Sequence, residues 1–314
     1  YSALGANTTG NSNTAYGYIA LSSNTTGGYN TAIGNGVLSY NTTASGNTGM
    51  GYSSLRVNTT GYKNTAYGYS ALGSNTTGSF NTASGYQSLN SNTTGNYNTA
   101  SGYYSLYSNT TGSNNTAYGS FSLRYNTTGT RNIAIGYGTL DAPDTENDNL
   151  AIGYDALGGS IAGGEYNVAI GNYTLDATTS GDNNVAMGYN ALTSNTVGSN
   201  NVALGHSAMF SNTGDAAQAT EGSDNVAIGS NALYSMTEGY KNISIGTDAF
   251  KDGTTAAQNF GIGYQSMENA TTSWSNVAIG YEALKGATTD TDMTGSGNVA
   301  IGYQVLHKNT TGYN

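Results

Sequence analysis

The sequence predicts an all-β fold, a parallel β-solenoid of about seventeen coils. Three observations predict it: a repeat of 17 residues recurs along the chain, each repeat contains a short alternating segment, and each contains turn residues at fixed places. Gly supplies 46 of the 314 residues and charged residues only 8%, a composition that also occurs in disordered chains. The regular placement of 27 Tyr and of one large apolar residue in every repeat favours an ordered fold.

The motif Asn-x-Ala-x-Gly defines the repeat, and most of its steps are 17 residues long. Steps of 18, 24 and 22 residues place their extra length in the Ser/Thr/Gly-rich part of the repeat, as in 211–224 and 285–297. Insertions confined to one place predict a surface loop there. The motif glycines are Gly17, Gly34, Gly51, Gly68, Gly85, Gly102, Gly119, Gly136, Gly153, Gly171, Gly188, Gly205, Gly229, Gly246, Gly263, Gly280 and Gly302.

Each repeat contains one clear strand and two turns. In the repeat that starts at Asn167, Val168 and Ile170 share one face while Ala169 and Gly171 share the other, which is the period of a strand. A large apolar residue, usually Leu, follows four residues after the Gly, and an Asn-Thr-Thr-Gly turn such as 75–78 comes next. A 17-residue repeat is too short to contain a helix as well, so each repeat predicts one coil, stacked at about 4.8 Å.

The Asn that opens every repeat predicts a ladder. Stacked coils align these side chains, whose amides can then hydrogen-bond from coil to coil. Asn is also a favourable turn residue, and both roles can hold together. The ladder positions predicted include Asn13, Asn30, Asn64, Asn167 and Asn276, each followed by its motif glycine, Gly17, Gly34, Gly68, Gly171 and Gly280.

Charge divides the chain into two compositional halves. Residues 1–131 are rich in Asn, Thr and Tyr and contain no Asp or Glu, whereas residues 132–314 are rich in Val and Ile and hold all 18 acids. Nucleic-acid binding is disfavoured, because Lys and Arg are few and do not cluster. No apolar run approaches the roughly 18 residues of a membrane span. Because the chain begins and ends inside a repeat, we expect 1–314 to be one continuous solenoid taken from a longer array.

The segment Asn-Val-Ala-Ile-Gly, at 167–171, 225–229, 276–280 and 298–302, resembles the head repeats of YadA-type trimeric autotransporter adhesins, which also occur in phage tail-fibre-like proteins. The resemblance runs through all seventeen repeats, although the family's repeats are typically shorter. It implies a left-handed parallel β-roll whose three copies pack into a trimer that projects from a cell surface and binds host or matrix molecules. Residues 1–131 depart from the pattern, since Thr, Tyr or Ser often replace Val and Ile, as at 81–85.

Association of several chains is expected on energetic grounds as well. Ordering the backbone of one thin coil costs more than three buried apolar side chains return. We therefore expect lateral self-association, either a homotrimer or a filament.

The function expected is that of an extracellular structural or adhesive fibre that presents a repetitive surface for attachment, with a carbohydrate or surface receptor as partner. Alternatives are a glycosylated surface filament, a phage tail-fibre shaft and an ice-binding solenoid. An enzyme is not expected, because the two histidines, His206 and His307, occupy positions held elsewhere by Tyr or small polar residues and no Cys accompanies them. No cofactor is expected.

Three further patterns carry chemistry. Asn-Thr-Thr is an N-glycosylation signal, although turn chemistry alone also explains it. The candidate glycosylation sites are Asn7, Asn24, Asn41, Asn58, Asn75, Asn92, Asn109, Asn126 and Asn309. The Thr pairs of the same segments also suggest ice binding, yet they fall in predicted turns and not on a flat strand.

Tyr often follows the motif Gly, and an exposed rank of Tyr could stack structurally or bind sugars. The rank of Tyr comprises Tyr18, Tyr52, Tyr69, Tyr86, Tyr103, Tyr137, Tyr154, Tyr189, Tyr264, Tyr281 and Tyr303.

A cluster of acidic residues is a candidate calcium site, because calcium prefers oxygen ligands. The candidate ligands are Asp141, Asp144, Glu146 and Asp148, with solvated loops as the alternative.

Overall fold

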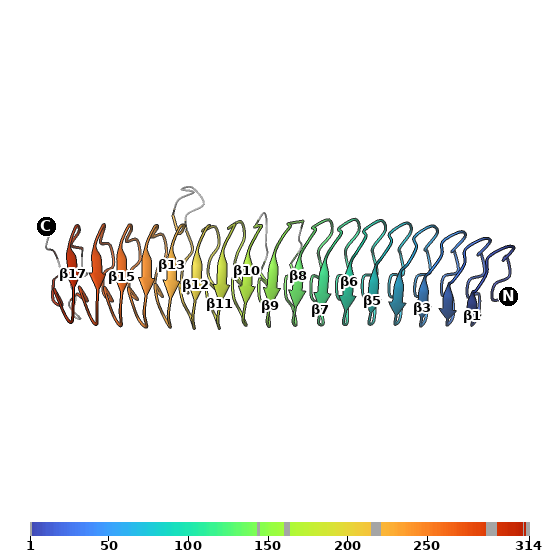
Figure 1. Cartoon of the computed structure of the whole chain (residues 1–314), viewed down its shortest axis with the longest axis horizontal. Coiled ribbons are helices and arrows are strands. Elements are labelled where there is room, and N and C mark those ends of the chain that lie inside the picture. Colours follow the sequence, from blue (N-terminus) through green and yellow to red (C-terminus); the bar gives the residue numbers. More distant parts are fainter. Residues whose placement is uncertain are drawn as a thin grey trace. The chain divides into compact units, whose positions relative to one another are not determined.

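The computed structural model describes residues 2–142, 145–159, 164–214, 221–286, 294–309 and 311. They form two compact units, Tyr1–Asn149 (unit 1) and Leu150–Asn314 (unit 2). Each unit is a parallel β-solenoid built from three-residue strands, and the described residues contain no helix (Figure 1). The predicted fold class and tandem repeat are confirmed.

Neighbouring strands in each unit pair in parallel and in register. In unit 1, Thr82 pairs with Thr99, Ala83 with Ala100 and Ser84 with Ser101, each 17 residues further on. Unit 1 contains β1 (Thr14–Tyr16), β2 (Thr31–Ile33), β3 (Thr48–Met50), β4 (Thr65–Tyr67), β5 (Thr82–Ser84), β6 (Thr99–Ser101), β7 (Thr116–Tyr118) and β8 (Ile133–Ile135). Unit 2 contains β9 (Leu150–Ile152), β10 (Val168–Ile170), β11 (Val185–Met187), β12 (Val202–Leu204), β13 (Val226–Ile228), β14 (Ile243–Ile245), β15 (Phe260–Ile262), β16 (Val277–Ile279) and β17 (Val299–Ile301).

Each coil turns at residues with left-handed backbone angles. In the coil of β6, Tyr104 (φ 55°) and Leu106 (φ 51°) both adopt them, and Tyr97 (φ 58°) does so just before the strand. Asn and Gly adopt such angles readily, yet the predicted Asn-Thr-Thr-Gly turn at 75–78 has none. That turn is held instead by hydrogen bonds, so its Asn has a different role.

The core of each coil is narrow and consists of small side chains with one large apolar residue, usually Leu. In the coil of β5, Ala83, Ser88 and Leu89 are all fully buried. Val168 and Ile170 do share one face of their strand, as expected, but that face is the outer one, and Ala169 points inward. At the middle position of the strand, a coil of this size has room for Ala and not for Val or Ile as well.

Candidate functional site

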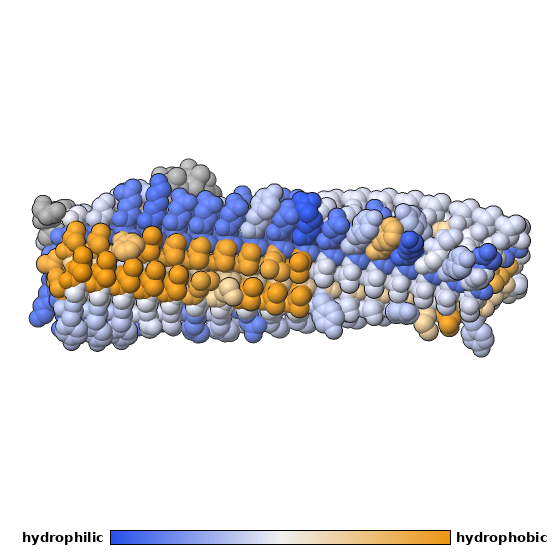
Figure 2. Space-filling model, in the orientation of Figure 1, coloured by the Kyte–Doolittle hydropathy of each residue, from blue (hydrophilic) through white to orange (hydrophobic). Residues whose placement is uncertain are grey.

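Unit 2 carries a continuous apolar face on the outside of its strands. Each of β9–β17 buries its middle residue and turns its first and third residues outward, so that Ile228 and Met187 are exposed while Ala227 is fully buried. Figure 2 shows the resulting hydrophobic band along these strands. We call it the Val/Ile face; it comprises Leu150, Ile152, Val168, Ile170, Val185, Met187, Val202, Leu204, Val226, Ile228, Ile243, Ile245, Phe260, Ile262, Val277, Ile279, Val299 and Ile301.

Strands β1–β7 of unit 1 present different chemistry at the same positions, whereas β8 still carries the exposed Ile133 and Ile135. The first residue of each strand from β1 to β7 is Thr, so a rank of Thr lies on a strand face as well as in the turns. The third residues vary, and the exposed Tyr16, Tyr67 and Tyr118 project among them. A face interrupted by tyrosines is not the flat Thr array that ice binding would require.

The motif asparagines stack into a ladder inside the coils. The backbone N–H of Asn81 donates to Oδ1 of Asn64 (2.9 Å), while Nδ2 of Asn81 donates to the carbonyl of Gly95 (2.8 Å). The ladder therefore runs mainly from backbone to side chain, with direct amide–amide bonds in only some steps, such as Asn81 Nδ2 to Asn64 Oδ1 (3.2 Å). Asn30, Asn64, Asn167 and Asn276 are fully buried, and Asn13 at the end of unit 1 is half-buried.

The asparagines of the Asn-Thr-Thr segments form a second ladder. Nδ2 of Asn75 donates to Oδ1 of Asn58 (2.7 Å) and to the carbonyl of Gly78 (2.9 Å), and Oδ1 of Asn75 accepts from Nδ2 of Asn92 (2.7 Å). This second ladder was missed in the sequence, although its 17-residue recurrence was visible there. Its fully buried members are Asn24, Asn41, Asn58, Asn75, Asn92, Asn109 and Asn126.

This packing argues against glycosylation at those seven sites. Nδ2, the atom that would carry the glycan, lies inside the coil and uses its hydrogens within the fold. A sugar attached there would have to displace the neighbouring coil. Asn7 and Asn309, near the ends of the chain, are half-buried.

Two of the four calcium candidates, Asp148 and Glu146, have protein partners. Nε and Nη2 of Arg131 donate to the two carboxylate oxygens of Asp148 (2.6 and 2.7 Å), and this pairing lowers the pKa of Asp148. The Glu146 carboxylate accepts from the backbone N–H of Thr145 (2.6 Å). Asp144 lies outside the described residues, among which no three His, Cys, Asp or Glu side chains gather as metal ligands. The geometry at Asp148 is that of an ion pair.

The tyrosines after the motif Gly stack along each unit. Ring centroids of Tyr52, Tyr69, Tyr86 and Tyr103 follow one another at 5.1, 5.1 and 5.4 Å. In unit 2, Tyr264, Tyr281 and Tyr303 stack at 5.2 Å per step.

The two histidines, His206 and His307, both contact side chains of neighbouring coils. His206 stacks on Tyr189 with ring centroids 5.5 Å apart, and so occupies a place in the rank of Tyr. His307 lies 3.4 Å from the Glu282 carboxylate. Ring stacking at His206 and a surface contact with a carboxylate at His307 account for both positions.

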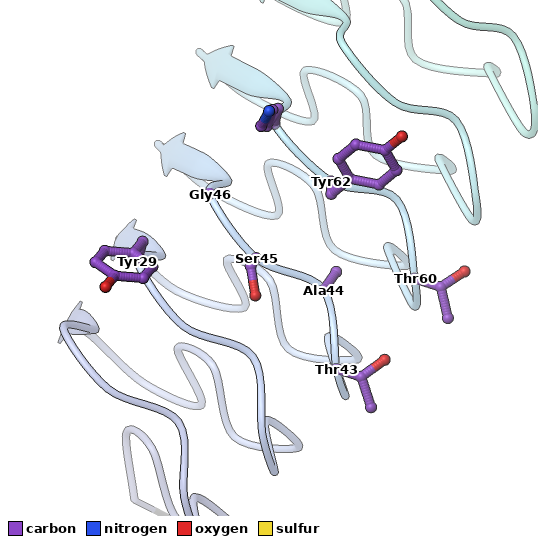
Figure 3. A pocket seen from close by; sticks show the side chains of 8 residues that line it. Tyr29, Thr43, Ala44, Ser45, Gly46, Thr60 and Tyr62 are labelled. Atoms are coloured by element: carbon purple, nitrogen blue, oxygen red, sulfur yellow. The ribbon is translucent and has the colours of Figure 1, made fainter.

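Unit 1 also contains a cavity of about 490 Å³. Tyr29 and Tyr62 flank it, and Thr43 and Thr60 lie along its edge (Figure 3). Ala44, Ser45, Gly46 and Lys63 complete the lining. A second cavity, of about 350 Å³, lies beside Tyr52, Tyr69 and Arg56. Aromatic rings, hydroxyls and a cation therefore converge on open surface in this unit.

Comparison of the chain with family models, with curated proteins and with solved structures finds no match in any of the three. In the part of the chain that the structure describes, no helix has the length and apolar character needed to cross a membrane.

Proposed function

We propose that this chain is a segment of an extracellular fibre that presents a repetitive surface for attachment, and that three copies associate side by side through the Val/Ile face. The observation that carries the proposal is that face itself: two unbroken ranks of apolar side chains on the outside of nine consecutive strands. Soluble monomers rarely expose a contiguous apolar patch of this extent, which is typical of an interface. The resemblance to trimeric adhesin heads supports the same arrangement.

Association through the Val/Ile face would leave the other surfaces free for attachment. The stacked tyrosines and the two cavities of unit 1 carry aromatic and hydroxyl groups suited to recognition. A phage tail-fibre shaft would use the same geometry. A glycan-coated filament is disfavoured, because seven of the nine candidate glycosylation asparagines are buried in the second Asn ladder.

Charged substitutions on the Val/Ile face test the proposal. Native mass spectrometry of the unaltered chain is expected to give three chains, each with the mass of the bare sequence. Ile228→Lys combined with Ile245→Lys is expected to give monomers, since unpaired ammonium groups in an apolar interface cost several kcal/mol, about 3–5. Both side chains point outward, so each coil should still form.

A matched pair of substitutions in the same region serves as the control. Thr255→Lys with Thr272→Lys adds the same charge at exposed turn positions outside the Val/Ile face, and Glu238 already places a charge at this position one coil earlier. This control should remain trimeric. A folded monomer for the unaltered chain would contradict the proposed association.

A further inference from the structure

We propose that the cavity beside Gly46 binds a pyranose ring that carries a carboxylate, as in a uronic acid. This inference rests on the proposed attachment function and names the class of ligand. The site exists because one repeat lacks a side chain where its neighbours have large ones.

The missing side chain belongs to the position directly before the motif Asn. In consecutive coils this position holds Tyr29, Gly46, Lys63, Phe80 and Tyr97. The coils are in direct contact, since Gly46 N donates to Gly28 O (3.0 Å) and Lys63 N donates to Ser45 O (3.1 Å). Two coil steps of about 4.8 Å separate the Tyr29 and Lys63 backbones, and a gap of roughly 10 Å admits one ring in van der Waals contact with both sides.

Where the rank is complete, its aromatic side chains stack on each other. Phe80 and Tyr97 have ring centroids 4.9 Å apart and are nearly parallel. The Tyr29 ring has no such neighbour at Gly46 and is 68% exposed. A ligand ring in the gap would therefore take the place that an aromatic side chain takes two coils further on.

Hydroxyl groups around the gap match a sugar. Thr43 and Thr60 lie along one edge of the cavity (Figure 3). Ser45 Oγ accepts a hydrogen bond from Gly28 N (3.0 Å), so its own hydrogen can be donated to a ligand. Aromatic faces at Tyr29 and Tyr62 suit the C–H face of a pyranose, and the hydroxyls suit its edge.

The charge of the region selects an acidic sugar over a neutral one. Residues 1–131 contain four Lys or Arg and no Asp or Glu. Lys63 lines the cavity, and its Nζ lies 5.3 Å from the centroid of Phe80. Rotation of this flexible side chain would exchange that cation–π contact for a charge-assisted hydrogen bond to a ligand carboxylate, which is stronger.

Filling the gap tests the site. Gly46→Tyr would put a ring into the cavity, and the position tolerates it: Tyr29 and Phe80 adopt the same left-handed angle (both φ 61°) as Gly46 (φ 73°). The atom nearest to a Cβ at Gly46 would be Lys63 Cγ, at 3.4 Å. The matched control is Asn114→Tyr, at the same position of another coil (φ 62°) and outside the cavity.

Isothermal titration calorimetry of the full chain would use tetragalacturonate and its methyl ester, which has the same rings without the charge. We expect the unaltered chain and Asn114→Tyr to bind the acid about tenfold more tightly than the ester, and Gly46→Tyr to bind neither. Lys63→Gln should bind acid and ester equally. Thermal unfolding followed by circular dichroism would verify that all variants fold.

Each other outcome overturns a defined part of the inference. Unchanged binding by Gly46→Tyr would place the site elsewhere, and equal affinity of the unaltered chain for acid and ester would exclude charge recognition. Absence of binding to both would reject the uronic-acid site. Native mass spectrometry on the same samples distinguishes failure of the uronic-acid site from failure of the proposed fibre. A monomer that binds tetragalacturonate would contradict the fibre and support the site. A trimer that binds no tetragalacturonate would support the fibre and contradict the site.

Discussion

Asn75→Asp is expected to destabilise unit 1 by about 3–5 kcal/mol at neutral pH, the cost of an uncompensated buried charge. Asn75 is fully buried, and its Nδ2 donates to two oxygens, Asn58 Oδ1 and Gly78 O. A carboxylate would turn both contacts into oxygen–oxygen repulsion. Chemical unfolding monitored by circular dichroism would measure the loss.

The pH dependence of Asn75→Asp gives the same prediction a second readout. Burial raises the pKa of the new carboxyl in the folded state above its unfolded value of about 3.9. The loss of stability is therefore complete above the raised folded-state pKa and becomes smaller as the pH falls through it toward the unfolded value. Asn114→Asp is the control, because Asn114 is exposed and Asp148 and Asp224 occupy its position in other repeats. Equal stability of the two variants at pH 7 would contradict the second Asn ladder.

Gly102→Ala is expected to cost about 3 kcal/mol or more, from backbone strain and overpacking together. Gly102 has φ 143°, an angle that residues with a Cβ rarely adopt. The added Cβ would lie 2.6 Å from the carbonyl carbon of Gly119 and closer still to its oxygen. Because the obstacle is the backbone of the next coil, no side-chain rotation relieves it.

Gly46→Ala is the control for Gly102→Ala. Other repeats hold Tyr, Lys or Phe at the position of Gly46, and its Cβ contact with Lys63 is an ordinary one. We expect a change within about 1 kcal/mol for this control. If the two variants unfold at the same denaturant concentration, the close contact between the motif glycines is not present in solution.

The repeat, the strand and the parallel stacking could be predicted because each depends on spacing alone. The inner and outer faces of the strand could not be assigned from hydropathy, which favours Val168 and Ile170 as core over Ala169. The internal comparison of repeats holds the better signal: the middle residue stays small, as Ala, Gly49 or Ser244, while its neighbours change freely between Thr, Val, Tyr and Ile. A position restricted in size across both compositional halves is the interior one.

The second Asn ladder could not be assigned from its short motif alone. Asn-Thr-Thr reads as a glycan acceptor in three residues, and only the recurrence of Asn at the coil spacing distinguishes a buried stack from a surface signal. The cavity at Gly46 could not be found without a fold, because its walls come from three coils. Once the coils are aligned, a Gly between Tyr29 and Lys63 marks it.

The most direct test of the coil itself is the accessibility of single cysteines in β5, which is feasible because the chain contains no native Cys. Thr82 and Ser84 are exposed in this strand and Ala83 is fully buried. Thr82→Cys and Ser84→Cys are expected to react with a thiol reagent as fast as an unfolded peptide, and Ala83→Cys at least about 100-fold more slowly, since it reacts only after local opening. Rapid labelling of Ala83→Cys together with protection of Thr82→Cys and Ser84→Cys would contradict the account, because the face we place outside would then be the core.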